Sequence, residues 1–171
     1  MQKIYVGITN DEWFYNLRDI SPKVVNFWTP GAKNFKALSK GEWFLFKLHA
    51  PQNYIVGGGK FDFFSIMSLS NAWKKYSIQN GVYALQDLTS KVRAYRKNTR
   101  GNLDENSIGC ILLKDVVFLA ERDWFPPPAD WSRCIVRGKT YEMDSESGTY
   151  IFENFIKGQK RLLSEKTSSP L

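Results

Sequence analysis

The sequence predicts an α+β domain in which short helices flank a barrel-like mixed sheet. Two observations lead to this fold class. Strand-like runs alternate with short helical patterns, and the strand pattern at 54–64 contains the run Gly57-Gly58-Gly59, which favours a bend or a close backbone approach at a barrel corner. A chain of 171 residues is long enough to bury a hydrophobic core. We therefore expect a folded domain over residues 1–157 and a helix end with a polar tail over 158–171.

The first elements are predicted from local patterns. Residues 3–9 alternate between apolar and polar side chains, which is typical of a strand with one buried face. Asn10 is a favourable N-cap for a short helix, and the Ser21-Pro22 pair ends that helix. A second short strand is expected at 24–28, and Thr29-Pro30-Gly31 then turns the chain.

The middle of the chain is expected to contain two apolar strands and two helices. The runs 43–48 and 54–64 are the strands, and a loop separates them. Ser70 or Asn71 is expected to cap a helix that continues to Tyr76. A second helix follows, because apolar residues then recur at helical spacing. They are Leu85, Leu88, Val92 and Tyr95.

After a polar loop at 98–107, the last part of the chain is expected to hold one strand and one helix. Residues 109–119 have the strand pattern, and Pro126-Pro127-Pro128 ends the regular structure. Residues 131–141 are basic and aromatic, and we expect them to be irregular. A final helix is expected at about 149–163, with a polar linker after it.

The net charge of +7 predicts a polyanionic partner, with nucleic acid as the first choice and a membrane surface as the second. A basic protein with no such partner is the alternative. Cys110 and Cys134 do not have the spacing of a metal site, and no secretory signal precedes the first strand pattern. A reduced, cytoplasmic location is therefore expected. No apolar run reaches the roughly 20 residues that span a bilayer.

Residue types that carry catalysis or bind metals are sparse. His49 is the only histidine, and no Cys, Asp or Glu lies beside it at ligand spacing, so we expect it to make one hydrogen bond at a strand end. The acidic group at 142–146 lacks the glycine and the spacing of a calcium loop. No nucleophile motif and no Walker motif is present. We expect a binding protein without cofactor or metal rather than a catalyst.

Aromatic, amide and basic side chains are concentrated between residues 26 and 36. Trp28 ends a strand pattern just before a turn, and from there an indole can stack on a nucleobase. Asn26 offers a donor and an acceptor to the edge of such a base. Core packing is the alternative for these aromatic residues. The expected base-pocket residues are Asn26, Trp28, Trp13, Asn34, Phe35 and Trp131.

Basic residues in this stretch and in two later ones are expected to contact phosphates. Such contacts weaken steeply as the salt concentration rises. The expected backbone contacts are Lys33, Lys36, Lys91, Arg93, Arg96, Lys97, Arg133, Arg137 and Lys139.

Four segments also resemble a known family. They are VVNFWTPGAKNFKALSKGEWFLFKLHAPQNYIVGGGKFDFFSI, IGCILL, PPPADWSRCIVRGKTYE and the opening YVGITNDEWF. Together they resemble the N-terminal domain of bacterial HNH endonucleases regarded as modification-dependent restriction enzymes, over residues 3–157. The resemblance implies a PUA-like mixed β-barrel, in the broad group that includes EVE, YTH and SRA modules.

The resemblance also implies a function. Modules of this group admit a modified base to an aromatic pocket, so double-stranded DNA with a methylated or hydroxymethylated cytosine, read by base flipping, is the expected ligand. An HNH nuclease domain, in cis or in trans, is the expected partner. One histidine does not supply such a nuclease, so no cleavage is expected from this chain. The alternatives are an RNA-binding reader of methylated adenine, a fragment with the activity of its parent endonuclease, and a protein-interaction domain.

Overall fold

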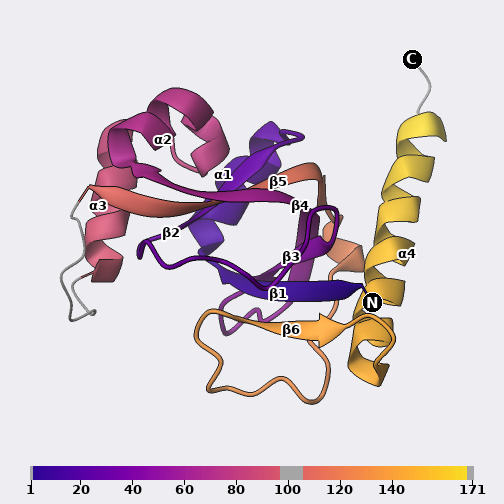
Figure 1. Cartoon of the computed structure of the whole chain (residues 1–171). Helices are drawn as coiled ribbons and strands as arrows, with labels where there is room; N and C mark the ends of the chain where they lie inside the picture. Colours follow the sequence, from indigo (N-terminus) through magenta and orange to yellow (C-terminus); the bar gives the residue numbers. More distant parts are fainter. Residues whose placement is uncertain (1, 97–105, 169–171) are drawn as a thin grey trace.

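A computed structural model describes residues 2–96 and 106–168, and shows a six-stranded mixed sheet with helices around it (Figure 1). The strand order is β2-β5-β4-β3-β1-β6. β1 and β3 run parallel, and every other neighbouring pair runs antiparallel. The strands are β1 (Lys3–Thr9), β2 (Val25–Thr29), β3 (Trp43–Leu48), β4 (Ile55–Ser68), β5 (Ser107–Phe118) and β6 (Gly138–Glu142).

The helices lie at two ends of the molecule and on one side between them. In Figure 1, α2 and α3 lie together at one end, and α4 stands at the other end beside β1 and β6. The helices are α1 (Asp11–Ile20), α2 (Leu69–Tyr76), α3 (Leu85–Arg96) and α4 (Glu146–Ser168), with 3-10 turns η1 (Ser77–Asn80) and η2 (Glu121–Asp123).

The sheet curls until strands that are not neighbours touch through their side chains. Phe27 of β2 and Phe44 of β3 have ring centroids 4.6 Å apart, although β5 and β4 lie between these strands in the sheet. This contact across the inside of the sheet is what a barrel requires. The predicted α+β fold with a barrel-like mixed sheet and flanking helices is therefore confirmed.

Two hydrophobic cores hold the helices against the sheet. The larger core joins α1, α2 and α3 to the strands and contains most of the buried aromatic rings. The smaller core lies under α4, where Phe155 packs edge-on against Trp43 with centroids 4.8 Å apart. Burial of such apolar side chains contributes about 1.5–3 kcal/mol each, so both faces of β3 stabilise the fold.

The glycine run in β4 lies where two strands approach closely. A Cβ on Gly58 would lie 2.7 Å from the carbonyl oxygen of Phe44 in β3, and one on Gly59 would lie 3.0 Å from Cβ of Leu113 in β5. Only glycine fits such a position without moving the neighbouring backbone. The predicted close backbone approach in this strand is confirmed.

Some predicted boundaries are correct and others are wrong. Asn10 caps α1, since its side chain accepts from the N–H of Trp13. The predicted cap of α2 is wrong, because β4 runs on to Ser68 and the hydroxyl of Ser68 accepts from Asn71. Residues 131–141 are not irregular throughout, because β6 pairs with β1 from Gly138 onward.

The last helix also continues beyond its predicted end. α4 extends to Ser168, so a linker beginning at Ser164 is wrong for residues 164–168. Two ion pairs fasten the helix to η2: Arg161 to Asp123 at 2.9 Å, and Arg122 to Glu165. The division of the chain at residue 157 stays a prediction. Most of the expected loop at 98–107 lies outside the described residues.

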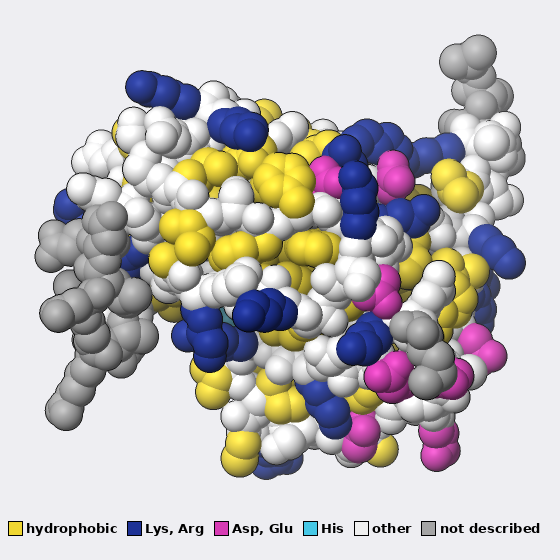
Figure 2. Space-filling view, in the orientation of Figure 1, with side chains coloured by type: hydrophobic (Ala, Val, Ile, Leu, Met, Phe, Trp, Pro, Cys, Tyr) yellow, Lys and Arg dark blue, Asp and Glu magenta, His cyan; other side chains and the backbone are white. Residues whose placement is uncertain are grey.

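The surface carries both basic and apolar side chains. Figure 2 shows hydrophobic side chains gathered in a band across one face, over β4, with Lys and Arg side chains above and below the band. Among the described helices, none has the length and apolar character that crossing a membrane requires.

Candidate nucleic-acid interface

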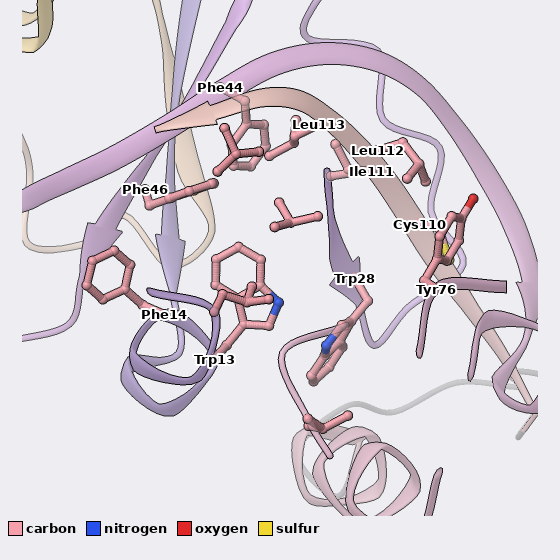
Figure 3. Close-up of a cluster of buried hydrophobic side chains, with 14 of the residues drawn as sticks. Trp13, Phe14, Trp28, Phe44, Phe46, Tyr76, Cys110, Ile111, Leu112 and Leu113 are labelled. Atoms are coloured by element: carbon pink, nitrogen blue, oxygen red, sulfur yellow. The ribbon is translucent and has the colours of Figure 1, made fainter. Parts of the chain in front are cut away.

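Trp28 lies in the interior, and the predicted open indole is wrong. Only 8% of the residue is exposed, and the indole N–H donates to the carbonyl of Asn80 at 3.0 Å. Figure 3 shows the ring among the buried side chains of the larger core, near Cys110. A buried aromatic ring whose only polar atom is satisfied contributes to stability and offers no face to a base.

Trp13 and Asn26 are also interior residues, so the predictions that they line an open pocket are wrong. Trp13 packs edge-on against Phe27 and Phe46, and its indole N–H donates to the carbonyl of Asn26 at 3.3 Å. Asn26 is fully buried, and its side-chain amide donates to Asn80 at 2.8 Å. The side chain of Asn26 points from β2 toward η1, and Trp13 projects from α1 against β2, so neither faces solvent.

Asn80 connects these buried groups, and sequence reasoning missed it. Its side-chain oxygen accepts from Asn26, and its amide donates to the carbonyls of Ala72 at 3.1 Å and Ser77 at 2.9 Å. Its own carbonyl accepts from Trp28. One asparagine therefore ties β2, α2 and η1 together. In the sequence it appears only as part of an Asn-Gly turn signal.

One exposed aromatic side chain beside this core is Tyr95, at the end of α3. Its ring contacts that of Trp28 edge-on, with centroids 6.1 Å apart, and 40% of the residue is exposed. The side-chain amide of Asn10 donates to the Tyr95 hydroxyl at 3.0 Å, which fixes the orientation of the ring. Tyr95 lies at helical spacing from Leu85, Leu88 and Val92, so the sequence predicts that it is a core residue. The structure shows that it is exposed instead.

The β2–β3 loop (residues 30–42) presents basic and amide side chains to solvent. Lys33, Asn34 and Lys36 are exposed. None of the three has an ion pair or hydrogen bond with another described side chain. These three residues of the predicted set are accessible to a ligand, as the sequence suggests.

Aromatic packing and one carboxylate hold this loop in place. The ring of Phe35 is half-buried, 5.1 Å from that of Tyr5 and 5.5 Å from that of Phe61. Glu42 accepts from the backbone N–H groups of Ser39 and Lys3, each at 2.6 Å. Phe35 is thus an anchor rather than an open stacking face. An anchored loop loses little conformational entropy when a ligand binds to its lysines.

The other predicted phosphate contacts fall into two groups. Three already have partners inside the protein: Lys91 pairs with Glu12 at 2.6 Å, Lys139 pairs with Asp130 at 3.3 Å, and Arg96 donates to the carbonyls of Pro30 and Ser107. Arg93, Arg133 and Arg137 are exposed and make no ion pair with a described acidic residue. Lys97 lies outside the described residues.

Trp131 is half-buried and contacts a buried lysine. Lys47 of β3 is 3% exposed, and its ammonium lies 5.2 Å from the centroid of the Trp131 ring. The ammonium donates to the carbonyl of Leu48 at 3.1 Å and to the side chain of Asn53 at 3.0 Å. Burial lowers the pKa of Lys47. This cation lies over one face of the indole, and the ring also packs against the smaller core.

Groups with catalytic potential are scarce among the described residues. No three His, Cys, Asp or Glu side chains in 2–96 and 106–168 are placed to hold a metal ion. Burial raises the pKa of the Cys110 thiol to about 11, so this thiol stays protonated at neutral pH. The backbone N–H of His49 donates to Asp11 at 3.4 Å.

Comparison with known proteins gives the fold a name. No protein-family model matches the sequence, and no curated protein matches it significantly. An ASCH protein from Zymomonas mobilis has the same architecture, with a TM-score of 0.58 and 10% identity over 88% of this chain and 94% of that chain. The chain has an ASCH-type fold. Structures of two point mutants of the Zymomonas protein give TM-scores of 0.58 and 0.59, again at 10% identity and 88% of this chain, over 96% and 94% of their own chains.

The likeness confirms the predicted barrel-like α+β architecture, while membership of the PUA-like superfamily stays a prediction. An identity of 10% concerns the architecture alone. The roles of individual residues must therefore be argued from the geometry above, and the association with an HNH endonuclease stays a prediction.

Proposed function

We propose that this ASCH-fold chain is a nucleic-acid-binding domain, and that the β2–β3 loop contacts the phosphate backbone. The observation that carries the proposal is the pair Lys33 and Lys36, exposed and without an acidic partner on an anchored loop. The net charge of +7 acts in the same direction, because it attracts a polyanion over a distance. Arg137 extends this basic surface toward β6. It lies close enough to Tyr5 for its charge to oppose the increase in the pKa of Tyr5 that burial causes.

The proposal also includes specificity for a modified base in DNA, which the sequence resemblance supports. A DNA duplex carrying methylated or hydroxymethylated cytosine is the proposed ligand, and an HNH nuclease domain is the proposed partner. Since Trp28 is buried, the proposed stacking surface for the extruded base is Tyr95, which Asn10 holds in place. Extrusion costs a few kcal/mol, and stacking on an aromatic side chain returns about 1–3 kcal/mol.

The loop lysines are tested by replacing both with alanine. Lys33→Ala with Lys36→Ala is expected to weaken binding to duplex DNA at low salt. It should also reduce the slope of log affinity against log salt by about 1.8, since each phosphate contact contributes about 0.9. Fluorescence anisotropy at four salt concentrations measures both quantities.

A matched variant on the far end of the molecule controls for the change of charge. Lys157→Ala with Lys160→Ala removes the same two charges from exposed positions on α4. Its slope should stay close to that of the wild type. Equal losses in the two double variants would show that net charge, and not the loop, determines binding.

A panel of otherwise identical ligands then tests the specificity. It contains duplexes with cytosine, methylcytosine, hydroxymethylcytosine or methyladenine, and an RNA strand with methyladenine. The proposal requires tighter binding to a modified-cytosine duplex than to the unmodified one. Preference for the methylated RNA would instead assign an RNA reader.

A further inference from the structure

The outer half of β4 carries an exposed surface that is separate from the β2–β3 loop. β3 pairs with β4 only as far as Lys60, whereas β4 continues to Ser68 beside β5. In this outer half, 40% of Phe63 and 52% of Ile66 are exposed. The two side chains lie three residues apart in a regular part of the β4–β5 ladder, so they point to opposite faces of the sheet, and Phe63 is the one beside Lys75 of α2.

Cations accompany this exposed aromatic ring. The ammonium of Lys75 in α2 lies 5.9 Å from the centroid of the Phe63 ring, and Lys74 beside it is exposed as well. Neither lysine has an ion pair with a described acidic residue. The one carboxylate next to Phe63 in the strand is Asp62, which Lys40 and Lys114 bind at 3.3 and 3.1 Å. The net charge beside the ring is therefore positive.

Two hydroxyls on the same elements have no hydrogen-bond partner among the described residues. Ser65 Oγ of β4 and the Tyr76 hydroxyl of α2 are both buried. Ser65 lies opposite Cys110 in the β4–β5 ladder, and Figure 3 shows Tyr76 close to Cys110. Unpaired buried hydroxyls are costly, and most such groups in proteins bind a water molecule or a ligand. Both hydroxyls are closed off from the surface, so the groups available to a ligand here are Phe63 and the two lysines.

We infer that the β4–α2 surface, which consists of Phe63, Lys74 and Lys75, is a stacking subsite for an unpaired nucleotide of a single strand. The inference rests on the proposed function and adds the ligand class. A base stacks on Phe63, while Lys74 and Lys75 contact the adjoining phosphate. Bases inside a duplex have both faces covered, so an aromatic ring selects an unpaired base.

A nucleic acid fits this surface better than a protein does. A protein partner would need acidic side chains opposite the two lysines and an apolar side chain against Phe63. A nucleotide supplies the negative charge and the aromatic face in one unit. The basic character of the whole chain agrees with this choice.

The test uses the full chain and two strands of equal charge. One is a 12-residue single-stranded DNA, and the other is the same length of abasic backbone. Phe63→Ala is expected to bind the base-bearing strand about tenfold more weakly than the wild type does, because one base loses its stacking. Its affinity for the abasic strand should not change. Phe63→Trp should retain the wild-type affinity for both strands.

Two further arms make the outcome decisive. Tyr54→Ala removes an equally exposed aromatic ring just before the first residue of β4, nine residues from Phe63, and should leave both affinities unchanged. Equal affinities of wild type and Phe63→Ala for the base-bearing strand would overturn the inference. So would equal losses on both strands, since they would show a structural effect. Absence of wild-type binding to every strand and duplex would overturn the proposed function itself.

Discussion

Replacement of Trp28 by alanine is expected to destabilise the fold by about 3–5 kcal/mol, the usual cost of truncating a buried tryptophan. The variant loses the ring from the larger core and leaves the Asn80 carbonyl without the indole N–H that it accepts. Urea unfolding followed by circular dichroism measures the effect, as a lower midpoint with an unchanged slope. Binding of nucleic acid should fall only as far as the folded fraction falls.

A phenylalanine variant separates the two causes. Trp28→Phe keeps most of the ring and removes the N–H, so it should cost about 1–3 kcal/mol, less than the alanine variant. An alanine variant as stable as the wild type would contradict the buried position of Trp28. If that stable variant also lost its preference for modified DNA, the indole would be a base-stacking residue after all.

Replacement of Asn80 by alanine is expected to cost about 2–4 kcal/mol, because it leaves several buried polar groups without partners. The amide of Asn26 loses its acceptor, and the carbonyls of Ala72 and Ser77 lose a donor. For a domain of this size, each kcal/mol lowers the unfolding midpoint by roughly 2–4 °C. Differential scanning calorimetry should therefore show a fall of roughly 4–16 °C.

A neighbouring position controls for the general effect of truncation in this turn. Ile78 lies in the same 3-10 turn and is 40% exposed, so Ile78→Ala should change stability by no more than about 0.5 kcal/mol. The double variant with Asn26→Ala should cost less than the sum of the two single changes, because the second change removes a group that has already lost its partner. Equal effects of Asn80→Ala and Ile78→Ala would contradict the network.

The elements that local signals determine could be predicted from the sequence. β1 and α1 follow from an alternating run and the cap at Asn10, both of which act within a few residues. β6 could not be predicted in this way. Its five residues bury only Tyr141, so they have no clear alternation, and the strand exists because its backbone pairs with β1, more than a hundred residues earlier.

The same difference between local and distant determinants explains which residues of the candidate site could be predicted. Lys33 and Lys36 lie in a polar stretch between strands, and such a stretch predicts exposure directly. The burial of Trp28 and Asn26 depends on Asn80, which is distant in the sequence and gives no local sign of its role. The local sequence around a tryptophan at a strand end is the same whether or not a later helix covers its side chain. The exposure of Tyr95 likewise depends on where α3 ends, and that of Phe63 on where β3 begins.

The most direct test of the account is to map a bound strand on the wild-type protein. Backbone amide NMR spectra of the labelled chain are recorded at low salt, with and without a short DNA duplex and a single strand. We expect the largest shifts in the β2–β3 loop for both ligands, and also around Phe63 for the single strand, with α4 unaffected. Shifts confined to α4, or no shifts with either ligand, would contradict it.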